Sequence, residues 1–263
     1  MAKWTFFGRI LPERFPFSLG GPISGASTAE KHQVSYTWTI RIFAGQIVAS
    51  VDVTNGAPDV LTLRNFIQDE IRVIADTVGY LTGFSFDVEI ISASCLETDE
   101  WQIFGIGIPV VTDRRDQTKA RMMNSGLLED VMRHPSAQIV LADFREAMRS
   151  AVGTGFFCYR AVEAMMQSMK KSEAEKEKEV WPRLRDALCV DLSAIEYLKA
   201  HADFPRHGKP NAITGEERAH VFQITDVIIE RYLKYLQGGR KPLLEAEFPT
   251  ITALGQPAPQ LRF

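Results

Sequence analysis

Long apolar runs are absent from this sequence. A bilayer-spanning helix needs roughly 20 predominantly apolar residues in succession, and no segment approaches that length. The segment MAKWTFFGRILPERFPF is interrupted by Arg9, Glu13 and Arg14, so it has no continuous apolar core of the kind found in signal peptides. We therefore expect a cytoplasmic protein with no membrane partner.

Cysteine is scarce as well, since the 263 residues include only Cys95, Cys158 and Cys189. Three widely spaced cysteines form neither a disulfide framework nor a C-x-x-C metal site, so we predict buried thiols in a reducing compartment. The formal net charge is −3. A strongly basic surface is thus excluded for the molecule as a whole, and any contact with nucleic acid must be local.

Four catalytic motifs are missing from the sequence: G-x-x-x-x-G-K-[ST], G-x-G-x-x-G after a strand, H-E-x-x-H and G-x-S-x-G. Nucleotide hydrolysis, dinucleotide redox chemistry, zinc proteolysis and serine hydrolysis therefore lack their usual basis. A metal site made of His201, Asp203 and His207 matches no standard zinc spacing. We expect no metal and no cofactor.

The first part of the chain alternates apolar and polar residues with the period of two that is typical of half-buried strands. Residues 34–42 show this pattern most clearly, and 47–53 repeat it after Gly45, which predicts an antiparallel hairpin. The opposite, polar face of the first strand carries Ser35, Thr37, Thr39 and Arg41.

Apolar residues three and four positions apart over 63–81 predict one long helix, and further strands are expected at 84–90 and 101–111. We assign residues 1–112 to an α+β domain of unknown role, built from an antiparallel sheet and this helix. Residues 113–136 lose both periodicities and are interpreted as a connector, which has room for a short helix inside it.

An all-α antiparallel bundle is predicted over 137–238, followed by a Pro-rich tail over 239–263. Residues 137–169 predict one long helix or two in tandem, because Gly153 and Gly155 lie inside the pattern. Shorter helices are expected at 180–188 and from Asp191 to Leu198, and a last one starts at the capping box of Thr214 and Glu217. The α+β fold class follows from these two halves.

Titratable side chains gather in the segment before the last helix, which we interpret as a loop. A histidine near its reference pKa of about 6.5 is suited to acid and base chemistry at neutral pH. The structural alternative is that these residues cap and shape a turn. The candidate residues are His201, Asp203, Arg206, His207 and Lys209.

Two features of the C-terminal half resemble the HEPN superfamily of helical bundles, which includes domains of bacterial defence proteins. One is the segment Phe156–Ala164, FFCYRAVEA, which looks like the family's first-helix motif, and within which Arg160 and Glu163 are expected to form an ion pair. The other is Arg206-His207-Gly208 followed by the 214–218 segment, TGEER, and an amphipathic helix. A weaker resemblance connects the same helices to methylamine-utilisation J-type accessory proteins.

The HEPN resemblance implies a metal-independent ribonuclease site in which His207 is the family's histidine and Asp203 lies near its polar position. The family's arginine, four to six residues earlier, is missing, because that spacing gives Ala200, His201 and Ala202. His201 is then the only cation available, and it offers fewer donors than a guanidinium.

We therefore expect a non-catalytic, HEPN-like interaction or scaffold protein, homodimeric through the bundle, in a bacterial defence, stress or accessory pathway. A protein partner is expected for the N-terminal domain. The alternative is RNA binding or weak metal-independent RNA cleavage by the 201–209 segment. In that alternative His207, Arg206 and His201 catalyse, and Lys209 and Arg206 bind RNA.

Overall fold

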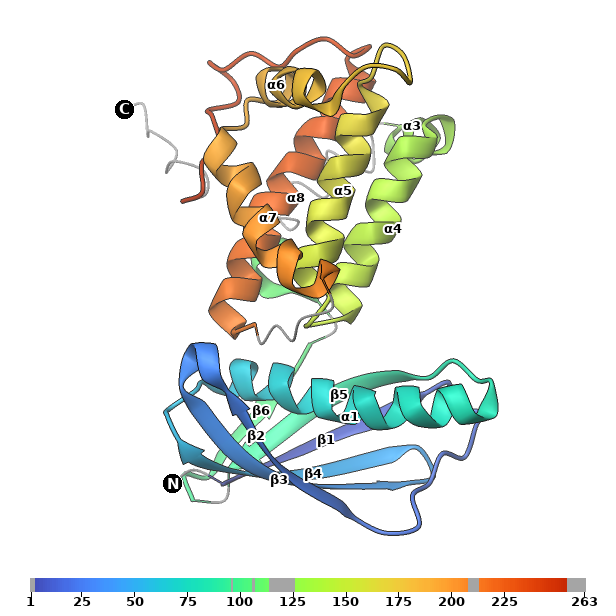
Figure 1. The fold of residues 1–263 in the computed structure, drawn as a ribbon, viewed down its shortest axis with the longest axis vertical. Coiled ribbons are helices and arrows are strands. Elements are labelled where there is room, and N and C mark those ends of the chain that lie inside the picture. The colour runs from blue at the N-terminus through green and yellow to red at the C-terminus, as the bar shows by residue number, and fades with distance from the viewer. Residues whose placement is uncertain (1–2, 96, 106, 114–125, 208–212, 255–263) are drawn as a thin grey trace. The chain divides into compact units, whose positions relative to one another are not determined.

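The computed structural model describes residues 3–95, 97–105, 107–113, 126–207 and 213–254. The chain forms two compact units: Met1–Ile106 with Ala212–Gly215, and Gly107–Asn211 with Glu216–Phe263. The first is built on an antiparallel sheet and the second is helical (Figure 1). The predicted α+β class is confirmed.

Six antiparallel strands in the order β2-β3-β4-β1-β5-β6 make up the N-terminal sheet. The predicted hairpin is confirmed, since its tip residues Ala44 and Gly45 have φ values of 47° and 76°, as a tight turn between twisted strands requires. The strands are β1 (Lys3–Leu11), β2 (Ile23–Ala29), β3 (Val34–Phe43), β4 (Gln46–Asn55), β5 (Asp87–Cys95) and β6 (Glu100–Ile103).

Helix α1 (Val60–Thr82) lies across one face of this sheet (Figure 1). It begins at Asp59, whose side chain accepts hydrogen bonds from two backbone N–H groups, and ends at Gly83 with a φ of 73°. The buried side of α1 joins the inward-facing side chains of the strands in one core, which includes Phe6, Ile40, Ile47, Ile67, Ile71 and Ile90. The long helix predicted over 63–81 is thus confirmed.

One strand prediction needs correction, and two strands were missed. The expected strand over 101–111 ends at Ile103, and residues 109–113 are helical. Strands β1 and β2 were not predicted. β2, ISGASTA, has no apolar alternation, because it is an edge strand defined by its pairing with β3.

The C-terminal unit contains α3 (Leu127–Arg133), α4 (Pro135–Arg149), α5 (Thr154–Ser168), α6 (Glu177–Leu188), α7 (Leu192–Arg206) and α8 (Gly215–Gln237), whose first residue is grouped with the N-terminal unit. The tandem alternative for 137–169 is confirmed, since α4 and α5 are separate helices. A short helix inside the expected connector is confirmed, since residues 127–133 form α3. Aromatic contacts join the helices in one core, as between Phe144 of α4 and Phe222 of α8 at 5.6 Å.

Two further expectations from the sequence concern the cysteines and membrane-spanning helices. Cys95, Cys158 and Cys189 are free and buried, as predicted. Among the described helices, none combines the length and the apolarity needed to cross a membrane.

The tail after α8 is held against the bundle at Ile251. Ile251 is fully buried and forms a bridge with Val190, and its backbone N–H donates to the Cys189 carbonyl at 3.0 Å. The guanidinium of Arg231 on α8, 2% exposed, secures the same region. It donates to the carbonyls of Leu188 at 3.0 Å, Cys189 at 2.6 Å and Pro249 at 2.7 Å.

We predict that Arg231→Met lowers the free energy of unfolding by about 3–5 kcal/mol, because three buried carbonyls lose a charged donor. Urea denaturation followed by circular dichroism measures this loss. Lys241→Met, at an exposed tail position, is the control and leaves the midpoint unchanged. Equal midpoints for the two variants would contradict the anchoring role.

Candidate functional site

The segment interpreted as a loop is helical for most of its length. α7 continues to Arg206, so His201 and Asp203 lie in its last turns, and His207 directly follows it. The helix extends this far because Ala194, Leu198 and Ala202, spaced four residues apart, are all fully buried in the bundle core. The loop prediction was therefore wrong for residues 201–206.

His201 is half-buried in a cluster of three rings. Its ring centroid lies 4.7 Å from that of Tyr197, and Tyr197 lies 4.8 Å from His220 of α8. His220 is fixed in turn, with Nε2 at 2.6 Å from the carbonyl oxygen of Ala253. A Cβ at Gly155 would overlap the carbonyl oxygen of His201, so α5 and α7 pack closely there. His201 is therefore packed by the ring of Tyr197 and by α5, which is the environment of a residue with a structural role.

His207 is exposed, in the turn that follows α7. Its backbone N–H donates to the Asp203 carbonyl at 3.1 Å. His201 and His207 are six residues apart, or about one and two-thirds helical turns, so the two positions do not share a helical face. The Arg206 side chain and all of Lys209 lie outside the described residues.

Arg160, in the segment that resembles the HEPN first helix, binds a carboxylate on the neighbouring helix. Its Nε donates to both oxygens of Asp143 at 3.0 Å, and its Nη2 also contacts Asp143. Asp143 is 3% exposed, and its hydrogen bonds raise the pKa of Arg160. A buried carboxylate needs a cationic partner more than an exposed one does, so Asp143 fixes this guanidinium, and the pairing with Glu163 stays a prediction.

The environments of two other reactive groups keep them protonated. Burial raises the pKa of the Tyr197 hydroxyl, and the carboxylates of Glu217 and Glu216 raise it further. Burial also raises the pKa of the Cys158 thiol to about 12. At neutral pH neither group is an anion that acts as a base or a nucleophile.

Metal ligands do not converge in the part of the chain that the structure describes. No cluster of three or more His, Cys, Asp or Glu side chains has the arrangement needed to hold an ion there, and this includes His201, Asp203 and His207. These residues therefore give no support to the metal site weighed from the sequence.

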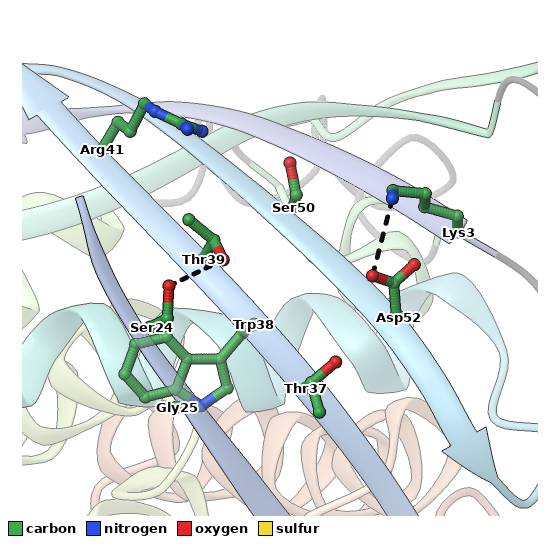
Figure 2. A pocket seen from close by; sticks show the side chains of 9 residues that line it. All are labelled: Lys3, Ser24, Gly25, Thr37, Trp38, Thr39, Arg41, Ser50 and Asp52. Carbon is green, nitrogen blue, oxygen red and sulfur yellow. Dashed lines mark hydrogen bonds and ion pairs between the residues drawn. The ribbon is translucent and has the colours of Figure 1, made fainter.

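A second site, missed in the sequence, lies on the N-terminal sheet. A hollow of about 320 Å³ is lined by side chains of β1 to β4, among them Lys3, Thr39, Arg41 and Asp52 (Figure 2). The polar alternation of 35–41 was the available signal. The hollow also depends on which strands lie beside β3. The alternation within one strand does not reveal its neighbours.

Comparison with known families matches both units. Residues 4–104 match the family model described as the N-terminal domain of the domain of unknown function DUF8168. Residues 126–237 match the model of its C-terminal domain. The chain therefore carries both DUF8168 domains. No curated protein and no solved structure matches it.

The DUF8168 domains correspond closely to the elements described above. The N-terminal match ends at residue 104, directly after β6, and the C-terminal match ends at Gln237, the last residue of α8. The C-terminal match begins before α3, inside the segment that the sequence interpretation assigned to a connector.

We predict that His201→Ala lowers the free energy of unfolding by roughly 1 kcal/mol or more, because the ring contact with Tyr197 is lost. His207→Ala, at an exposed position, changes it by less than about 0.5 kcal/mol. Chemical denaturation of both variants separates the two environments. A His201 variant as stable as the unmodified protein would argue against the ring cluster as a structural feature.

Proposed function

We propose that this DUF8168 protein is a non-catalytic interaction or scaffold protein with a HEPN-like C-terminal bundle. Its setting would be a bacterial defence, stress or accessory pathway. One observation supports this most: His201 is packed against Tyr197, whereas His207 is exposed beyond the end of α7, so the two candidate histidines have different environments. The arginine that catalytic HEPN domains use is also missing from the sequence.

Homodimerisation through the bundle is part of this proposal. Leu128 and Met132, four residues apart on α3, are 76% and 70% exposed, and Ile139 on α4 is 53% exposed. Gln237 of α8 donates to Asp130 at 2.9 Å, which fixes α3 against the bundle. Clustered apolar side chains on a fixed surface are typical of protein interfaces, and a two-fold dimer covers such a surface with its own copy.

We predict that the double substitution Leu128→Glu, Met132→Glu shifts the protein from dimer to monomer, because two carboxylates would be buried in the interface. Sedimentation velocity at micromolar concentration measures the shift. Leu244→Glu, at a tail position that is 64% exposed, makes the same chemical change elsewhere and leaves the dimer intact. A monomeric unmodified protein would refute dimerisation.

RNA binding, or weak metal-independent cleavage of RNA, is the second candidate. It is favoured by the exposure of His207, which leaves that imidazole accessible to a large ligand. Arg206, His201 and Lys209 are the further residues proposed for this activity. A histidine that gains or loses a proton near neutral pH is suited to activating a ribose hydroxyl.

We expect no cleavage of labelled single-stranded RNA by the purified protein in EDTA at low salt. If cleavage occurs and His207→Ala reduces it by about a hundredfold or more, as loss of a general acid or base does, the ribonuclease candidate replaces the scaffold proposal. Lys199→Ala removes an exposed cation from α7, the helix before His207, and is the matched control. If both variants cleave RNA equally well, the activity does not come from His207, and the scaffold proposal stands.

A further inference from the structure

The hollow on the N-terminal sheet opens on the face opposite α1. Inward-facing residues of β1, β3 and β4 alternate with outward-facing ones, and the outward set forms the floor and walls of the hollow. Figure 2 shows Lys3 on β1, Thr39 and Arg41 on β3, and Ser50 and Asp52 on β4 along this surface. Trp38, an inward-facing residue of β3, lies against Gly25 on the side of the sheet that α1 covers, and its indole N–H donates to Ser27 Oγ at 3.2 Å.

The pairing of the strands brings hydroxyl side chains together in one transverse row. In each pair the partners are directly opposite, so the row crosses five neighbouring strands at the spacing of about 4.8 Å between strands. Ser24 Oγ and Thr39 Oγ1 are 2.9 Å apart. From the β2 edge inward, the row consists of Ser24, Thr39, Ser50, Thr5 and Ser94, and the next residue opposite is Trp101 of β6.

Trp101 ends the row as a fixed aromatic surface. Its side chain is 60% exposed, and its ring stacks on Phe7 of β1 with centroids 5.7 Å apart and planes at 27°. An exposed indole held in this way presents an apolar ring face to a ligand. The hydroxyls beside it each donate and accept hydrogen bonds.

The charges around the row are few. Lys3 is paired with Asp52 at 3.6 Å, so these two largely offset each other. Arg41 is exposed and has no hydrogen-bond or ion-pair partner among the residues that the structure describes. One available guanidinium suits a ligand with an isolated carboxylate, to which it can donate two parallel hydrogen bonds. It is too little for a nucleic acid, which presents a phosphate at every step.

We propose that this face binds a short, mostly neutral oligosaccharide that contains an isolated uronic acid unit. The sugar chain lies across the strands, its hydroxyls bind the hydroxyl row, one ring stacks on Trp101, and one carboxylate binds Arg41. The hydroxyl row, the stacking surface of Trp101 and the single cation of Arg41 together match a polyhydroxylated, sparsely charged chain. This activity belongs to the N-terminal domain and does not depend on the scaffold role proposed for the bundle.

Calorimetric titration of the full chain tests the proposal with three probes, hexasaccharides that each combine five neutral units, of glucose, xylose or mannose, with one glucuronate unit. We expect at least one of them to bind at one site per chain. Its methyl-esterified form, which lacks the charge, should bind more weakly. Arg41→Gln should bind the acid and the ester equally, because the carboxylate then has no cationic partner.

Two further variants test the remaining contacts. Thr39→Val should weaken binding of the acid roughly fivefold, since one hydrogen bond is lost while valine remains favourable in a strand. Trp101→Ala should weaken it by at least about tenfold. Thr28→Val is the matched control, because Thr28 lies on the same face outside the hollow, hydrogen-bonded to Ser35 at 3.1 Å, and should leave affinity unchanged.

Three outcomes would overturn the proposal: no binding of any of the three acids at millimolar concentration, equal weakening by Thr28→Val and Thr39→Val, or tighter binding of a uridine hexanucleotide than of every hexasaccharide. Circular dichroism and thermal denaturation of each variant establish that it is folded. None of these results bears on dimerisation or RNA cleavage, so failure here is distinguishable from failure of the scaffold proposal.

Discussion

One helix covers one face of the six-stranded sheet, and this one-sided burial decides which side chains of the N-terminal domain can meet a ligand. Phe6, Ile40 and Ala49 point into the core, so their neighbours Thr5, Thr39 and Ser50 point outward. A slip of one residue in any strand would exchange the two sets and bury the hydroxyls. The tight turn at Ala44 and Gly45 sets the register of β3 against β4, and with it the position of the hydroxyl row.

Buried charge plays a different part in the C-terminal domain, where guanidinium groups hold helix ends together. Arg218 of α8 donates to Thr154 Oγ1 at 3.0 Å and to the Met148 carbonyl at 2.7 Å, which ties α8 to the junction of α4 and α5. Arg231 does the same for the end of α6 and for the tail. These two cations thus bind inside the bundle and not at a ligand-binding surface, because backbone carbonyls at buried helix ends need donors.

The strongly periodic elements could be predicted from the sequence, since the β3–β4 hairpin, α1 and the helices of the bundle show their own burial pattern along the chain. β2 could not, because a strand of Ser, Gly, Ala and Thr is recognisable only through its pairing with β3. The end of α7 was missed because Ala202, though fully buried, is too small to extend an apolar stripe visibly. The hydroxyl row was missed for a related reason: Thr5, Thr39 and Ser94 are far apart in the chain and are brought together only by register.

The two proposals have a joint consequence, because a dimer formed by the bundles carries two oligosaccharide-binding sheets. Each site alone would bind weakly, since sugar hydroxyls exchange water for protein hydroxyls at little net gain per hydrogen bond. A polysaccharide with repeated acidic units can engage both sites at once, and the second contact is then intramolecular, which raises the overall affinity without any new contact. Short and long chains of the same sugar would therefore differ in affinity for the dimer but not for the monomeric Leu128→Glu, Met132→Glu variant. This difference depends on dimerisation and sugar binding together, so it connects the surface of α3 to the face of the sheet without assuming how the two domains are arranged.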